Sequence, residues 1–128
     1  MSAKTRPTPG EMAILQVLWR RGPSTVRQIR QELESERPVG YTTILKLLQI
    51  MTVKGLVNRT AAARAHTYAA YSTEEQTQEL LVGDLMDRAF GGSTGRLVLQ
   101  ALSTRPASAS ELVEIRRVLS RLELEERS

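Results

Sequence analysis

Hydrophobic residues in the first half of the chain follow a helical period three times in succession, and then the period changes. The three segments with helical period are residues 8–21, 24–33 and 41–54. Two short β-prone runs, Leu56–Thr60 and Thr67–Tyr71, then flank Ala61–His66, and this arrangement predicts a hairpin. Three helices followed by a hairpin is the order of a winged helix-turn-helix domain, and this order constrains the fold more than any other feature of the sequence.

The predicted helices begin and end at residues with known capping chemistry. Thr8 is suited to cap the first helix, and Glu11 three residues later can complete a capping box. Thr25 and Gln28 have the same spacing at the start of the second helix, and Gly55 ends the third. The apolar stripes of the three helices are predicted to consist of Met12, Leu15, Leu18, Trp19, Val26, Ile29, Leu33, Ile44, Leu47, Leu48 and Met51.

Three further helices are predicted after residue 71. One opens at Ser72–Glu75, Gly91-Gly92 ends it, a short helix follows over Ser93–Leu102, and Ser108–Glu111 caps the last. These helices carry apolar faces but too few residues to close a core, so part of their surface is expected to meet a second copy of the chain. The expected dimerisation residues are Leu97, Val98, Leu112, Ile115, Leu119 and Leu122.

The predicted fold is therefore mainly α and has two domains. Residues 1–71 are expected to form a winged helix-turn-helix of three helices plus a β-hairpin wing, and residues 72–128 a C-terminal three-helix dimerisation region. Charge differs between the two. Residues 1–71 contain 11 Lys and Arg against 4 Asp and Glu, a net +7, whereas residues 72–128 contain 7 against 10, a net −3. A basic half joined to a mildly acidic half is typical when one half approaches a polyanion, although basic surfaces are often only solvated.

Composition excludes several classes of protein. The chain has no cysteine, which excludes disulfide scaffolds, thiolate metal sites and thiol catalysis. The basic start of the chain lacks the apolar run of a signal peptide, and no segment approaches the roughly 18 apolar residues that a membrane span needs. We expect a soluble, cytoplasmic protein that has no cofactor and does not insert into membranes.

The third predicted helix has two different faces. Opposite its apolar stripe lie hydroxyl, amide and ammonium groups, together with Val53, and such groups suit base edges and phosphates in the major groove. An ordinary amphipathic helix with a solvated polar face has the same pattern, and the preceding helix and the following hairpin favour recognition. Arginines in or beside the hairpin are candidates for contacts with the DNA backbone. The predicted DNA-binding residues are Thr42, Thr43, Lys46, Gln49, Arg59 and Arg64.

Two patterns suggest other chemistry, and both have simpler explanations. Gly91-Gly92-Ser93-Thr94-Gly95 matches the hydrolase nucleophile motif, but that motif needs a strand before the serine and a histidine downstream. The single histidine, His66, lies upstream, and without cysteines or other histidines nearby it does not found a metal site. We expect Gly91-Gly92 to separate two helices, and we expect no enzyme.

Several segments, in their order and spacing, resemble the penicillinase-repressor family of BlaI/MecI type. They are Leu15–Trp19, Thr25–Ile29, Tyr41–Leu45, Lys54–Arg59 and Gly91–Ser93. The resemblance covers nearly the whole chain. It implies a homodimeric transcriptional repressor that binds double-stranded DNA at an inverted-repeat operator and regulates β-lactam-resistance or related genes. It also implies a membrane sensor-protease as a further partner.

The chain departs from the family pattern at two places. Ile50 stands where members usually have arginine, so Lys46 is the candidate to replace that backbone contact. Gln100-Ala101 stands where members have the Asn-Phe bond that is cleaved on induction. The alternative function is a winged-helix protein–protein adaptor without sequence-specific DNA binding, and Lys46 with the basic N-terminal half favours the repressor.

Overall fold

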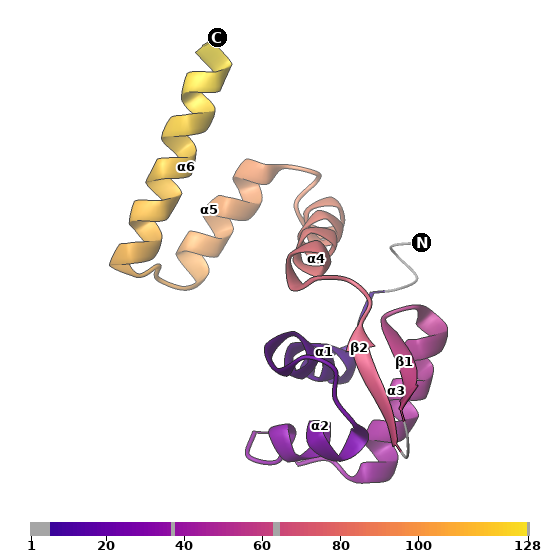
Figure 1. The fold of residues 1–128 in the computed structure, drawn as a ribbon. Helices are drawn as coiled ribbons and strands as arrows, with labels where there is room; N and C mark the ends of the chain where they lie inside the picture. The colour runs from indigo at the N-terminus through magenta and orange to yellow at the C-terminus, as the bar shows by residue number, and fades with distance from the viewer. Residues whose placement is uncertain (1–5, 37, 63–64, 128) are drawn as a thin grey trace. The chain divides into compact units, whose positions relative to one another are not determined.

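The computed structural model describes residues 6–36, 38–62 and 65–127 (Figure 1). Within these residues the chain forms six helices and one antiparallel hairpin, in the order that the sequence predicts. The elements are α1 (Pro9–Arg21), α2 (Val26–Leu33), α3 (Tyr41–Lys54), β1 (Val57–Ala62), β2 (Ala65–Ala70), α4 (Glu74–Ala89), α5 (Thr94–Thr104) and α6 (Ala109–Arg127). The chain divides into two compact units, of which the first ends at Asp84 and the second begins at Leu85.

The capping chemistry of the first unit is as the sequence predicts. The Thr8 hydroxyl accepts a hydrogen bond from the Glu11 amide at 3.2 Å, and the Glu11 carboxylate accepts one from the Thr8 amide at 3.0 Å. Thr25 and Gln28 form the same reciprocal pair at the start of α2. Gly55 ends α3 with φ of 81°, a left-handed conformation that a residue without Cβ adopts at little cost. These caps fix where α1, α2 and α3 begin or end.

All of the fully buried apolar side chains lie in the first unit, among the residues that the structure describes. They come from α1, α2, α3 and both strands: Ile14, Leu15, Val17, Leu18, Val26, Ile29, Leu33, Ile44, Leu48, Met51, Val57 and Tyr68. Met12, Trp19 and Leu47 were expected in the core and are half-buried beside it. This single core holds α3 against α1, α2 and the hairpin.

The hairpin is longer than the sequence predicts. Ala61 and Ala62 belong to β1 and Ala65 and His66 to β2, although Ala61–His66 was expected to be the connection. Alanine has a low strand propensity, so the sequence does not indicate a strand at these alanines. They belong to the strands because the antiparallel pairing continues in register to Ala62 and Ala65. The segment before α2 joins the hairpin as well, since the Ser24 and Tyr68 backbones exchange hydrogen bonds of 3.0 and 2.8 Å.

The first part of α4 is tied to the winged helix-turn-helix. The Trp19 indole donates a hydrogen bond to the Ser72 carbonyl at 2.9 Å, and Arg6 forms an ion pair with Asp84 at 2.6 Å. The capping box of α4 uses Thr73 and Gln76, one residue later than the predicted Ser72–Glu75. These contacts place the start of α4 within the first compact unit.

The second unit has no buried residue between 85 and 127. Gly91 and Gly92 have φ of 58° and 78° and separate α4 from α5, as expected. The Ser93 hydroxyl accepts a hydrogen bond from the Arg96 amide and caps α5, which leaves it in a structural role after a helix rather than a strand. The hydrolase interpretation of this segment therefore lacks the structural context that its motif requires.

Candidate nucleic-acid interface

The exposed face of α3 is the candidate DNA-contacting surface. Ile44, Leu48 and Met51 are at most 1% exposed and anchor the helix to the core. Opposite them, Thr42, Lys46, Gln49 and Val53 follow one another at i, i+4, i+7 and i+11, so their side chains form one row along the helix. All four are exposed, and Thr43 and Ile50 are exposed beside them. A row of hydroxyl, ammonium and amide groups is therefore presented to solvent on a rigid helix.

The charge on this face comes from the middle of the helix. Lys46 is exposed, whereas the other lysine of α3, Lys54, lies 2.7 Å from the Glu11 carboxylate. The Glu11 side chain is 3% exposed and also caps α1. Lys54 therefore joins the end of α3 to the start of α1, and Lys46 is the lysine of this helix whose side chain is exposed on the polar row.

Replacing Lys54 with methionine is expected to lower the free energy of unfolding by about 1.5–3 kcal/mol, because a buried carboxylate is deprived of its charged hydrogen-bond donor. Thermal or denaturant unfolding measures this decrease. The matched control is Arg20→Met, which breaks an exposed ion pair with Glu32 and is expected to cost less than about 1 kcal/mol. Equal decreases in the two variants would contradict a special role for the Glu11–Lys54 pair.

The hairpin supplies a second set of polar groups. Arg59 is exposed in β1 and pairs in register with Tyr68, and His66 is exposed in β2. The predicted contact Arg64 lies outside the described residues. Arg59 and His66 therefore extend the polar surface of the first unit onto the wing.

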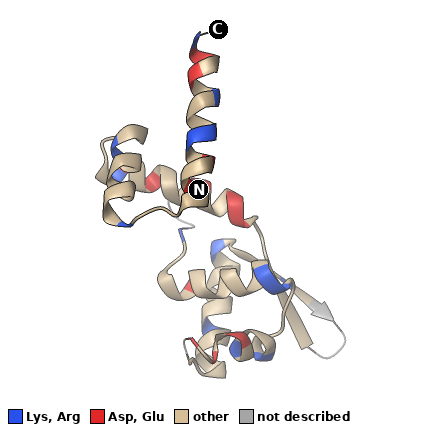
Figure 2. Ribbon diagram, turned by 90° about the vertical axis from the view of Figure 1, so that its left-hand side faces the viewer, with Lys and Arg blue, Asp and Glu red and all other residues tan. Residues whose placement is uncertain are grey.

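A cleft of about 420 Å³ separates the starts of α2 and α3 from β2. Its lining includes Arg27, Tyr41 and His66, which carry hydrogen-bond donors suited to phosphate oxygens. Arg27 and Tyr41 were not among the predicted contacts, because neither lies on the polar row of α3. The sequence feature that could have indicated these two residues as candidate phosphate contacts is their place at a helix start, since Arg27 is the second residue of α2 and Tyr41 is the first residue of α3. Figure 2 shows the described Lys and Arg residues, Arg27 among them, in blue.

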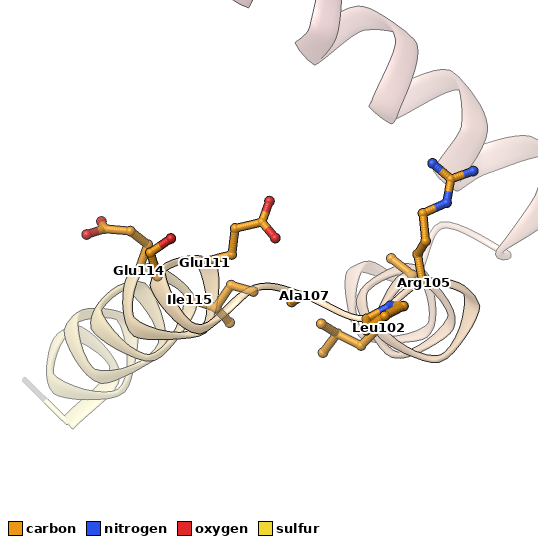
Figure 3. Close-up of a pocket in the computed structure, with 9 residues that line it drawn as sticks. Leu102, Arg105, Ala107, Glu111, Glu114 and Ile115 are labelled. Atoms are coloured by element: carbon orange, nitrogen blue, oxygen red, sulfur yellow. The ribbon is translucent and has the colours of Figure 1, made fainter.

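The predicted dimerisation residues lie on α5 and α6 in the second unit. Val98, Leu119 and Leu122 are 39%, 51% and 49% exposed, and the other three are half-buried. A groove of about 630 Å³ lies between α5 and α6. Figure 3 shows Leu102 and Ile115 turned toward this groove with Ala107 between them, and Glu111 and Arg105 projecting at one side. An apolar groove bordered by charged groups is typical of a surface that another chain covers.

Metal-binding and membrane-spanning features are absent from the part of the chain that the structure describes. Those residues contain no group of three or more His, Cys, Asp or Glu placed to hold a metal ion. None of the helices in residues 6–36, 38–62 and 65–127 is both long and apolar enough to span a bilayer.

Comparison with known proteins identifies the family. The family model described as penicillinase repressor matches residues 7–121. The chain belongs to the penicillinase-repressor family. The transcriptional regulator BlaI of Mycobacterium tuberculosis is 32% identical over 124 residues, which cover 96% of this chain and 89% of that protein. The penicillinase repressor of Bacillus licheniformis is 22% identical over 109 residues and 85% of each chain.

Solved structures support the fold. A MarR family protein from Bacillus stearothermophilus has a TM-score of 0.54 at 21% identity and covers 95% of this chain and 76% of its own. A transcriptional regulator from Thermotoga maritima has a TM-score of 0.52 at 20% identity, with coverages of 94% and 77%. The mainly helical, winged-helix fold predicted from the sequence is confirmed. As a member of the penicillinase-repressor family, the protein is a DNA-binding transcriptional repressor and not an enzyme.

Proposed function

We propose that the protein acts as a homodimer on an inverted-repeat operator and represses β-lactam-resistance or related genes. The observation that carries this proposal is the row Thr42, Lys46 and Gln49, exposed on the face of α3 opposite the buried Met51. Amide and ammonium groups on a helix of this kind form the contacts that distinguish base pairs in the major groove. Membership of the penicillinase-repressor family supports the same function, and duplex DNA as the ligand supports a cytoplasmic location.

In this proposal the N-terminal part of the chain binds DNA and the C-terminal part forms the dimer. Residues 1–71 bind DNA through Thr42, Thr43, Lys46 and Gln49 on α3, with Arg59 and Arg64 contacting the backbone from the wing. Residues 72–128 form the dimer. Support for dimerisation comes from α5 and α6, where no residue is buried and aliphatic side chains line an open groove. In a two-fold homodimer the same surface patch of each copy would be buried against the other.

The experiment that tests this function is selection of duplexes from a library randomised at its centre, using the purified chain. We expect enrichment of an inverted repeat whose half-site centres lie about one DNA turn apart, roughly 34 Å, or a multiple of it. Affinity for the enriched duplex should exceed affinity for a scrambled duplex at the same salt concentration by about a thousandfold or more. Sedimentation of the free protein at micromolar concentration is expected to show a dimer.

Two results would contradict the proposal in different ways. Failure to enrich any sequence would favour the adaptor function, in which α3 contacts a protein partner. Enrichment of a single, unrepeated site by a monomer would retain DNA recognition and overturn the homodimer.

The segment Gln100-Ala101 bears on how the repressor is released. Both residues are exposed in α5, and the Gln100 amide donates a hydrogen bond to the Thr104 hydroxyl at 3.2 Å within the same helix. Because this pair replaces the bond that the family pattern would place there, we expect no inducer-dependent cut between the two residues. Release from DNA would then need another trigger. Immunoblots after β-lactam treatment of cells that hold an active sensor-protease test this, and a fragment ending at Gln100 would refute it.

A further inference from the structure

Two aliphatic side chains interrupt the otherwise polar exposed surface of α3. Val53 is 89% exposed and Ile50 is 42% exposed. Val53 stands four residues after Gln49 and seven after Lys46, so it continues the row of candidate base-contacting residues. Ile50 stands four residues after Lys46 and lies beside that row. Neither is an isolated surface residue, because both share the face that the proposed function places against DNA.

The two halves of α3 offer different chemistry on this face. The first half presents the hydroxyls of Thr42 and Thr43 and the ammonium group of Lys46. The second half presents the amide of Gln49 beside the methyl groups of Ile50 and Val53, while Lys54 is held by Glu11. Because the Lys54 ammonium group is already paired, this end of the helix has no free cation for a phosphate contact. The exposed methyl groups of Ile50 and Val53 are instead suited to van der Waals contact with the one apolar group that base pairs display in the major groove, the methyl group on C5 of a pyrimidine.

We propose that Ile50 and Val53 contact the 5-methyl groups of thymines and thereby set the base preference of one end of each half-site. This proposal rests on the proposed function and adds a specificity determinant to it. Thymine and 5-methylcytosine share the methyl group. We assign the contact to thymine, because the A·T pair also displays the adenine edge that the neighbouring Gln49 amide is suited to bind.

The test uses the duplex enriched by the wild-type chain. Each thymine of a half-site is replaced, one at a time, by deoxyuridine, which removes the 5-methyl group and leaves base pairing unchanged. We expect at least one replacement in each half-site to weaken binding about fourfold, the effect of removing one buried methyl group. Val53→Ala and Ile50→Ala each change both copies of the dimer. Each is therefore expected to bind the thymine duplex about sixteenfold more weakly, fourfold at each half-site, and to show no thymine preference at its own position.

Arg59→Ala is the matched control. It is expected to weaken binding to the thymine and uracil duplexes by the same factor, because a phosphate contact does not depend on the methyl group. Thermal unfolding of each variant checks that the fold is retained, as exposed positions predict. A second arm replaces cytosines of the half-site by 5-methylcytosine, with no increase in affinity expected.

The outcomes separate this inference from the proposed function. Absence of any enriched sequence contradicts the proposed function itself. An enriched operator that binds equally well with uracil at every thymine position, and equally well to Val53→Ala and Ile50→Ala, overturns the inference alone. Tighter binding on cytosine methylation without weaker binding on uracil substitution would also overturn it, since the methyl group contacted would then belong to 5-methylcytosine.

Discussion

Replacement of both Leu119 and Leu122 by alanine is expected to convert the protein from a dimer to a monomer at micromolar concentration. Each change removes roughly three methylene equivalents, worth about 0.8 kcal/mol apiece when buried. Leu119 is 51% and Leu122 49% exposed in the single chain, so about half of each side chain is available for a partner to cover. With two changes in each of two copies, association is weakened by about 5 kcal/mol, which raises the dimer dissociation constant about a thousandfold or more.

A control on the same helix distinguishes this effect from unfolding of the helix. Arg117 and Arg121 lie on the opposite side of α6 from the leucines and are exposed, and their replacement by alanine should leave the dimer intact. Sedimentation equilibrium measures both variants, and circular dichroism checks that helix content is retained. A wild-type monomer, or a leucine variant that remains dimeric, would overturn the assignment of α6 to the interface.

Most of the fold could be predicted from local sequence features, chiefly helix-capping residues and glycines at helix ends. The Thr8–Glu11 and Thr25–Gln28 pairs form the capping boxes that their spacing predicts, and Gly55 ends α3. The strand ends were missed because alanine has no strand signal, and their pairing depends on register with the opposite strand. The Ser24–Tyr68 bridge was missed for a related reason, because one residue paired across the fold leaves no periodic pattern in the sequence.

Parts of the candidate site depend on segments that are distant in the sequence, and these parts could not be predicted from it. The sequence predicts Glu11 as a cap, but only the packing of α1 against α3 brings Lys54 to the same carboxylate. The cleft that contains Arg27 and Tyr41 likewise depends on how two helices meet β2. The exposed row of α3 was predictable, because one helical period places residues at i, i+4 and i+7 on one face. Which of those residues contacts DNA is not encoded in that period.

Replacement of Thr43 and Gln49 together by alanine is expected to weaken binding to the enriched operator by about 2–6 kcal/mol for each half-site, taking about 1–3 kcal/mol for each base-specific interaction removed. Gln49 can donate and accept at an adenine edge, and Thr43 lies near the start of α3, where recognition helices usually meet bases. Binding to a scrambled duplex should barely change, because neither residue is charged and non-specific affinity comes from phosphate neutralisation.

The matched control is Thr52→Ala, because the Thr52 hydroxyl donates a hydrogen bond to the Leu48 carbonyl at 2.8 Å and Thr52 lies off the row of candidate base-contacting residues. Titrations of the wild type, the double variant and Thr52→Ala on both duplexes at one salt concentration measure these effects. If the double variant binds both duplexes more weakly by the same factor, α3 does not recognise bases. If it binds both duplexes as the wild type does, the result favours a protein partner for α3.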